Sequence, residues 1–134
     1  MTKIEIHTAI FDDIKLSHKK YFRTLGKEAY RICRLLKENG DLPGKAPFHY
    51  LKKDELKHKT FHAGINLPEE NVDKKSGGRV IYIKENANLI RIMYLGPGHK
   101  DKRYDDPYFI VGLIESRYSN PTFIEYSEEI SFDI

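Results

Sequence analysis

The sequence has few of the features that anchor or cross-link a protein. Cys33 is its only cysteine, which excludes an internal disulfide and a cysteine-rich zinc site. No apolar run approaches the roughly 18 residues of a membrane-spanning helix, and the chain opens on alternating polar and apolar residues instead of the apolar core of a signal peptide. These absences predict a cytoplasmic protein without membrane contact, folded around one hydrophobic core.

Several catalytic motifs are also missing. Gly96-Pro97-Gly98 lacks the Lys-Ser/Thr that completes a nucleotide-binding phosphate loop, and no Gly-x-Ser-x-Gly elbow of a serine hydrolase occurs. His58 and His62 are spaced like a pair of zinc ligands, but no third ligand stands out. We therefore expect neither a metal nor a cofactor.

Charge is distributed unevenly along the chain. Residues 1–104 contain 22 basic and 13 acidic residues, whereas residues 105–134 contain one basic and seven acidic residues. A basic region of this kind is typical of a surface that binds a polyanion, and an acidic tail could compete with that ligand. Two solvated faces that never meet are the alternative.

Hydrophobic spacing predicts an α+β fold. Apolar residues recur every three or four positions in the segments expected to be helical, and alternate with polar residues in those expected to be strands. Asn39-Gly40 is typical of a helix end, and Asp106-Pro107 of a helix start. In chain order, the expected elements are a strand at residues 3–9, a helical hairpin at 11–22 and 27–38, an antiparallel meander of strands at 57–65, 79–84 and 89–95, a helix at 107–117, and a final strand at 124–134.

Positive and titratable side chains occur at particular points of this meander. Lys57 and Lys59 would share one face of its first strand, because side chains alternate along a strand, and Arg79 would begin the second. The third strand leads into residues 98–104, Gly-His-Lys-Asp-Lys-Arg-Tyr. The meander can therefore gather these cations on one concave surface.

In their order along residues 3–104, these segments resemble the RelE/ParE toxin superfamily of type II toxin–antitoxin systems. The matching parts are the strand and helical hairpin, Arg-Val-Ile-Tyr at 79–82, the apolar strand after it, and residues 98–104. The resemblance implies a RelE-like microbial RNase fold for residues 1–104, with residues 105–134 as an acidic extension packed on the same domain. The loop at 66–77 and the segment 107–134 are longer than is typical of the family.

The resemblance also implies a function. The RelE branch cuts messenger RNA on the ribosome and is neutralised by a cognate antitoxin, so mRNA, the ribosome and an antitoxin protein are the expected partners. Cleavage without a metal requires a base for the ribose 2′-hydroxyl, positive charge beside the phosphorane, and an acid for the 5′-oxygen. The candidate catalytic residues are Lys57, Lys59, Arg79, His99, Lys100 and Tyr104. Further RNA contacts are expected from Arg91, Lys102 and Arg103.

Within the catalytic set, the lysines and Arg79 would hold the phosphate, while His99 or Tyr104 would move protons. A tyrosine has an ordinary pKa of about 10, so Tyr104 can act as a base only if neighbouring cations lower its pKa. Otherwise Tyr104 would stack on a base or orient the substrate.

Other interpretations of the same residues stay open. A ParE-like, gyrase-binding toxin would share the fold without the ribonuclease residues, and a catalytically silent domain would bind RNA or protein only. At the level of single residues, Arg79 would then pair with a carboxylate, and Lys57 and Lys59 would form a solvated strand face. His99 would bond to backbone in a loop, and Tyr104 would lie at the edge of the core.

Overall fold

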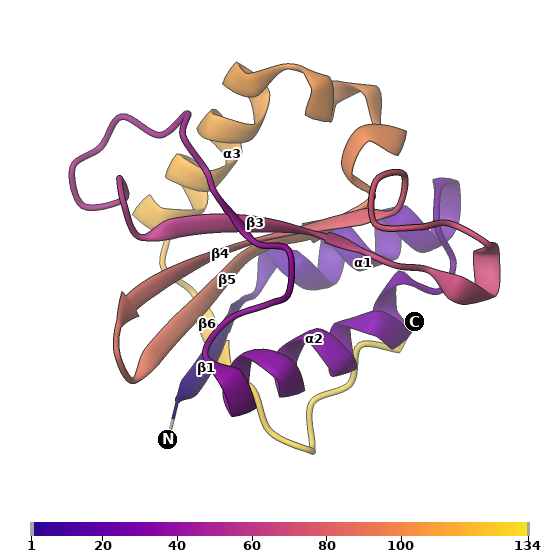
Figure 1. Ribbon diagram of the computed structural model, residues 1–134, viewed down its shortest axis with the longest axis horizontal. Coiled ribbons are helices and arrows are strands. Elements are labelled where there is room, and N and C mark those ends of the chain that lie inside the picture. Colours follow the sequence, from indigo (N-terminus) through magenta and orange to yellow (C-terminus); the bar gives the residue numbers. More distant parts are fainter. Residues whose placement is uncertain (1, 134) are drawn as a thin grey trace.

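A six-stranded, mostly antiparallel sheet forms the centre of the protein (Figure 1). The computed structural model describes residues 2–133. The strand order is β2-β3-β4-β5-β1-β6, and only the pairing of β1 with β5 is parallel. The elements are β1 (Lys3–His7), α1 (Ala9–Lys20), α2 (Leu25–Asn39), β2 (Ala46–Pro47), β3 (Thr60–Ile65), β4 (Gly78–Asn86), β5 (Leu89–Gly96), α3 (Pro107–Ser119) and β6 (Phe123–Glu125), with short 3-10 helices η1 (Pro68–Glu70), η2 (Gly98–Lys100) and η3 (Lys102–Asp105).

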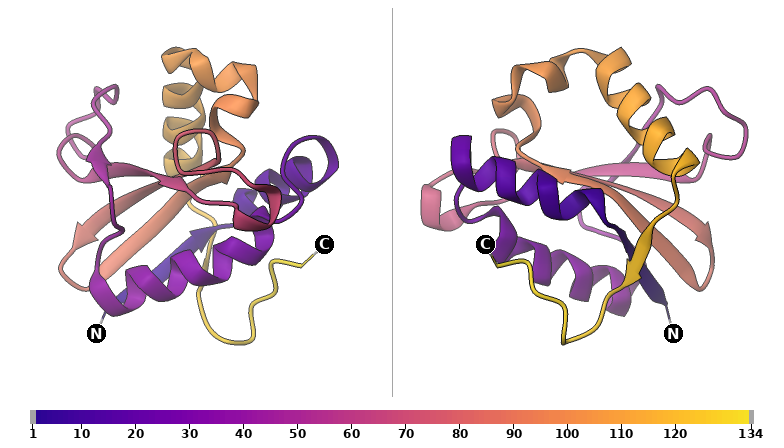
Figure 2. Two further views of the ribbon diagram at one scale, coloured as in Figure 1. Left: turned by 45° about the vertical axis from the view of Figure 1, so that its right-hand side comes forward. Right: turned by 180° about the vertical axis from the view of Figure 1, so that it is seen from behind.

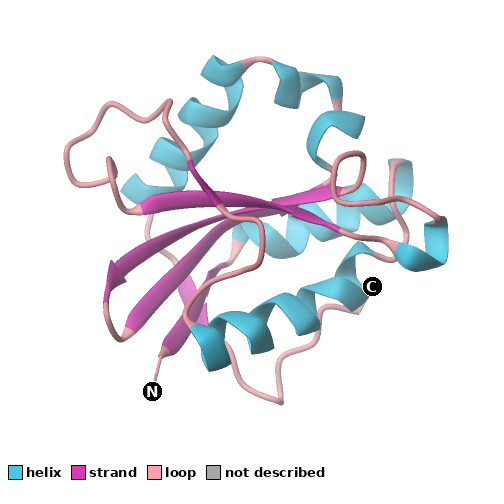
Figure 3. Ribbon diagram, viewed as in Figure 1, coloured by secondary structure: helices cyan, strands magenta, loops and turns pink. Residues whose placement is uncertain are grey.

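Helices cover both faces of this sheet (Figures 2 and 3). Helices α1 and α2 pack on one face and α3 on the other. Along β4, Val80 and Tyr82 belong to the core under α1 and α2, whereas Ile81 and Ile83 belong to the core under α3. Because side chains alternate along a strand, a strand covered on both faces needs apolar residues at consecutive positions. This accounts for the continuous apolar runs of the two central strands.

The α+β prediction is confirmed, and the helix boundaries follow from local signals. Helix α2 ends at Gly40, whose φ of +75° is a left-handed conformation that glycine adopts without strain. Helix α3 begins with Pro107 in its first turn, and the Asp106 side chain caps it by accepting a hydrogen bond from the Tyr108 amide at 2.9 Å. Both ends lie where the sequence places them.

The first strand of the expected meander is shorter than predicted. Residues 54–59 form turns, and β3 begins only at Thr60, whose hydroxyl donates to the Leu56 carbonyl at 2.8 Å. Leu56 is fully buried in the core under α3, which turns the chain away from the sheet before Thr60. The prediction that Lys57 and Lys59 share a strand face is therefore wrong.

The expected final strand at 124–134 is also mostly absent. Of this segment, only the residues of β6 pair with β1, and one further bond joins the Tyr126 amide to the Ile4 carbonyl before the chain leaves the sheet. The following residues cross to the helical hairpin, where the Phe132 ring stacks on Phe11 and contacts Tyr30. The alternation of apolar and polar residues in this segment thus reflects side chains packed against helices. Ile134 lies outside the described residues.

Residues 105–133 therefore contribute to both cores: α3 covers one face of the sheet, and the C-terminal segment packs on the hairpin of the other face (Figure 2). Among residues 2–133, no helix has the length and apolar character needed to span a bilayer.

Candidate functional site

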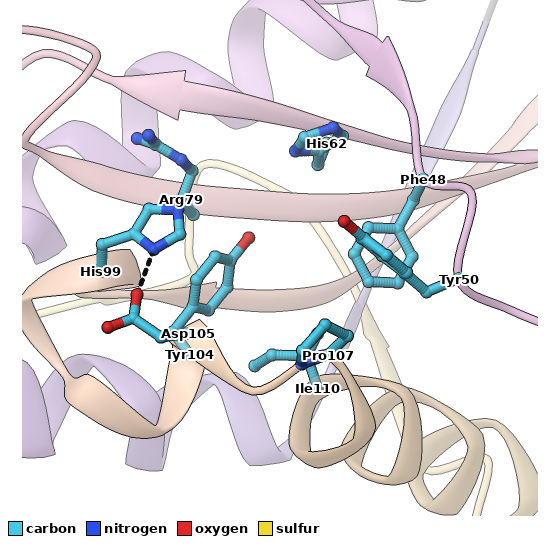
Figure 4. Close-up of a pocket in the computed structure, with 9 residues that line it drawn as sticks. All are labelled: Phe48, Tyr50, His62, Arg79, His99, Tyr104, Asp105, Pro107 and Ile110. Carbon is cyan, nitrogen blue, oxygen red and sulfur yellow. Dashed lines mark hydrogen bonds and ion pairs between the residues drawn. The ribbon is translucent and has the colours of Figure 1, made fainter.

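A cavity of about 220 Å³ lies on the α3 side of the sheet, where the ends of several segments converge (Figure 4). We call it the histidine cavity, because two histidines from distant segments line it. Strands β3 and β4, the segment after β2, the short helices after β5, and the start of α3 all contribute to its wall. Its lining residues are Phe48, Tyr50, His62, Arg79, His99, Tyr104, Asp105, Pro107 and Ile110.

Strand register places His62 and Arg79 on the same face. In the β3–β4 pair, His62 lies opposite Ile81, and Gly64 lies opposite Arg79. Arg79 and Ile81 are two positions apart on β4 and so point to the same side of the sheet, as do His62 and Gly64 on β3. His62 and Arg79 are therefore diagonal neighbours, a separation that long side chains can bridge.

Two glycines make room for Arg79. A Cβ atom on Gly64 would lie 2.3 Å from the Lys74 carbonyl oxygen and 3.1 Å from Nη1 of Arg79. A Cβ atom on Gly98, whose φ is +60°, would lie 2.6 Å from Cγ of Arg79. Any larger residue at either position would displace the Arg79 side chain or the 74–75 backbone beside it.

The Arg79 guanidinium is fixed by backbone carbonyls. Its Nη1 donates to Lys74 at 2.5 Å and to Gly78 at 2.9 Å, and its Nη2 donates to Lys75 at 2.9 Å. These bonds occupy three of the five guanidinium N–H groups. No ion pair within residues 2–133 includes Arg79, so the described chain supplies no carboxylate that neutralises this charge, and an anion can use the remaining donors.

His99 is oriented by Asp105. The two side chains meet at 2.6 Å between Nδ1 and Oδ1, and both are about half exposed. A carboxylate only accepts hydrogen bonds, so Nδ1 donates and Nε2 remains available to carry or accept a proton. The ring also packs edge-on against Tyr104, with 4.8 Å between the ring centroids.

His62 is half-buried in the same cavity, with its ring edge-on to Phe48. Burial lowers the pKa of His62 below its ordinary value of 6.5, and the positive charge of Arg79 lowers it further, followed by smaller contributions from His49 and His99. At neutral pH the ring is therefore uncharged. A neutral imidazole can accept a proton, which a base in this cavity must do.

Tyr104 is the wrong kind of group for a base. Burial raises its pKa to about 12, and the opposing effect of Arg79 is smaller. The expectation that neighbouring cations could lower the pKa of Tyr104 is thus not met. Its ring stacks on Tyr94, with centroids 5.6 Å apart. A neutral hydroxyl on a fixed ring can orient a substrate or donate a hydrogen bond.

The structure brings together only three of the six candidate catalytic residues, namely Arg79, His99 and Tyr104. Lys59 instead forms an ion pair with Glu85 at 2.8 Å. Lys57 lies outside the histidine cavity and lines neighbouring grooves, and Lys100 is exposed on η2 and is not part of the cavity wall.

Of the three further RNA contacts, two are engaged with carboxylates. Arg91 forms ion pairs with Glu5 at 2.9 Å and Glu85 at 2.8 Å. Arg103 forms an ion pair with Asp101 at 2.7 Å, while Lys102 is exposed on η3. Arg91 and Arg103 are therefore less available to bind phosphate than a surface arginine that forms no ion pair.

The residues that sequence reasoning missed are His62, Tyr50 and Asp105. The sequence suggests His62 only as a partner of His58, but His58 lies in the turn before β3, with a φ of +66°. Within residues 2–133, no three His, Cys, Asp or Glu side chains converge as metal ligands. The β3–β4 register puts His62 on the face of Arg79, and no local pattern in the sequence signals that register.

Comparisons with protein-family models, curated proteins and solved structures find no significant match to this chain. Any function must therefore be argued from the cavity and its residues.

Proposed function

We propose that the protein is a metal-independent endoribonuclease and that the histidine cavity is its active site. The observation that carries this proposal is the convergence of one arginine and two histidines, His62, Arg79 and His99, in a single cavity of about 220 Å³. Their chemistry supplies a base, a fixed positive charge and an acid, which are the three requirements of cleavage by the ribose 2′-hydroxyl.

Each residue has a distinct role in this reaction. Neutral His62 takes the proton of the 2′-hydroxyl, and the 2′-oxygen forms a bond to the adjacent phosphorus. Arg79 stabilises the negative charge that accumulates on the phosphorane. The bond between phosphorus and the 5′-oxygen then breaks, and protonated His99, oriented by Asp105, gives its proton to that oxygen. The products are a 2′,3′-cyclic phosphate and a 5′-hydroxyl.

The biological setting in this proposal is that of a type II toxin. Messenger RNA on the ribosome would be the substrate, a cognate antitoxin the inhibitor, and the cytoplasm the compartment. The sequence resemblance supports this setting, and the small size of the cavity agrees with it. A small cavity contacts only a short part of the mRNA, so the ribosome would help to orient that part for cleavage.

Arg79→Ala tests the proposal directly. With purified protein, end-labelled single-stranded RNA and excess chelator, we expect the wild type to produce 2′,3′-cyclic phosphate ends. Removing the charge beside the phosphorane is expected to slow cleavage by about 10²-fold or more. The wild type and Arg79→Ala are both assayed on free mRNA and on mRNA in a translation extract. The comparison of the two substrates measures ribosome dependence.

Arg34→Ala is the matched control, since Arg34 is an exposed arginine on α2, on the opposite face of the sheet. It should cleave like the wild type. Loss of free-RNA cleavage when chelator is added, or equal rates for Arg79→Ala and the wild type on both substrates, would contradict the proposal. Thermal unfolding of each variant verifies that it is folded.

The titration of His62 supplies an independent check. We expect its NMR midpoint to lie below pH 6.5, because burial and then Arg79 lower its pKa. A base must be unprotonated, so the acid limb of the wild-type pH profile should fall as the pH drops through this lowered midpoint. Arg79→Gln should raise the midpoint partway toward 6.5, since burial remains. An unchanged midpoint would show that Arg79 does not act on this ring.

A further inference from the structure

A second groove, of about 610 Å³, adjoins the histidine cavity. We call it the tyrosine groove. It runs between the segment 49–57 and the first half of α3, and it shares Tyr50 and Pro107 with the cavity. The groove and the cavity therefore lie next to each other at these two residues. The lining residues are His49, Tyr50, Leu51, Lys52, Lys57, Pro107, Tyr108, Val111 and Glu115.

Two tyrosine rings in this groove are exposed to solvent to an unusual degree. Tyr108, in the first turn of α3, is 81% exposed, and Tyr50 is 57% exposed. Tyr50 is held from one side by Phe48, with centroids 5.5 Å apart and the rings nearly perpendicular. Large aromatic side chains are normally more buried than this, and neither ring is needed by the core. Exposed rings at the mouth of a site are suited to stacking on a planar ligand.

The charge of the groove favours an anion. Lys52 and Lys57 line it, and neither takes part in an ion pair within residues 2–133. Glu115 is the only acidic residue among the groove's lining residues. Exposed aromatic rings beside free lysines are the combination by which proteins hold single-stranded nucleic acid without reading its sequence.

We propose that the tyrosine groove binds a nucleotide next to the two joined by the scissile phosphate. Tyr108 stacks on its base, and Lys52 and Lys57 contact the backbone phosphate. The proposal rests on the RNA cleavage proposed above and gives Lys57 a role in binding in place of the catalytic role that the sequence suggested. An RNA strand is favoured over a peptide because the groove adjoins the cavity that is proposed to hold the scissile phosphate.

The test compares two substrates. A dinucleotide lacks the nucleotide assigned to the groove, whereas a ten-nucleotide RNA carries it. Tyr108→Ala is expected to raise the KM of the longer RNA by about fivefold or more and to leave dinucleotide cleavage unchanged. Tyr108→Phe keeps the ring and should behave like the wild type. Lys57→Ala should weaken binding of the longer RNA and reduce the slope of log affinity against log salt by about 0.7.

Lys37→Ala, on α2 at the opposite face of the sheet, is the charge control and should leave both the KM and the salt slope unchanged.

Binding of a 2′-O-methylated ten-nucleotide RNA, which cannot be cleaved, separates the two proposals. If the wild type cleaves RNA but Tyr108→Ala leaves the KM and this affinity unchanged, the groove assignment is overturned and the nuclease stands. If nothing is cleaved but Tyr108→Ala weakens this binding, the groove stands and the nuclease falls. Absence of any binding to this RNA overturns the groove.

Discussion

Replacing His62 with alanine is expected to slow RNA cleavage by about 10²- to 10⁴-fold, the range for loss of a positioned proton-transfer group. His62 is the half-buried ring whose lowered pKa keeps it neutral at pH 7. Without it, the 2′-hydroxyl must lose its proton to water. The loss should lie in kcat more than in KM, because the ring acts on the reacting oxygen and contributes little to holding the strand.

His99→Ala is expected to have an effect of similar size, and the double variant should lose less than the product of the two single losses, because base and acid act in one reaction. The control is His18→Ala, an exposed histidine on α1 whose ring, within residues 2–133, bonds only to the Arg23 carbonyl. It should keep the wild-type rate. Cleavage by His62→Ala within about threefold of wild type would remove this residue from the mechanism, since loss of a general base costs far more.

Arg117→Met is expected to lower the free energy of unfolding by about 3–5 kcal/mol, the cost of leaving a buried charge without its partner. Arg117 on α3 and Asp13 on α1 are 13% and 10% exposed. They form two parallel bonds, at 2.6 Å between Nη1 and Oδ2 and at 2.7 Å between Nη2 and Oδ1. Arg117 also donates to the Met93 carbonyl at 2.9 Å. Urea unfolding measures the loss.

Two variants make this prediction specific. The double variant Asp13→Leu, Arg117→Met removes both charges and should recover most of the lost stability, because apolar side chains can replace a buried pair. Arg31→Met breaks a pair between neighbouring turns of α2, in which Arg31 is 45% and Glu28 15% exposed, and should cost less than about 1 kcal/mol. If Arg117→Met costs no more than Arg31→Met, the pair does not hold α3 in place.

This pair also matters for the site. Helix α3 contributes Pro107 and Ile110 to the histidine cavity and Tyr108 to the tyrosine groove. Its position relative to α1 depends on Asp13, a residue that no sequence pattern connects to Arg117, 104 positions away. Stability and site geometry are thus linked through contacts that form only in the folded chain.

The parts of the fold that sequence predicted well depend on local chemistry. Gly40 ends α2 because glycine adopts a left-handed backbone freely, and Asp106-Pro107 starts α3 because the carboxylate caps a free amide. The apolar runs of β4 and β5 identified the central strands. Arg79, His99 and Tyr104 were found because they stand at strand ends or directly after them, where a meander brings its segments together.

What the sequence determined by itself is therefore the class of fold, the central strands, the helix ends, and two of the three residues proposed for catalysis, Arg79 and His99. Tertiary structure decided the rest. Burial of Leu56 removed Lys57 and Lys59 from the sheet, and the β3–β4 register placed His62 beside Arg79. Register and burial depend on which distant segments pair, and a shift of one residue would turn every side chain to the other face. No local pattern contains that information.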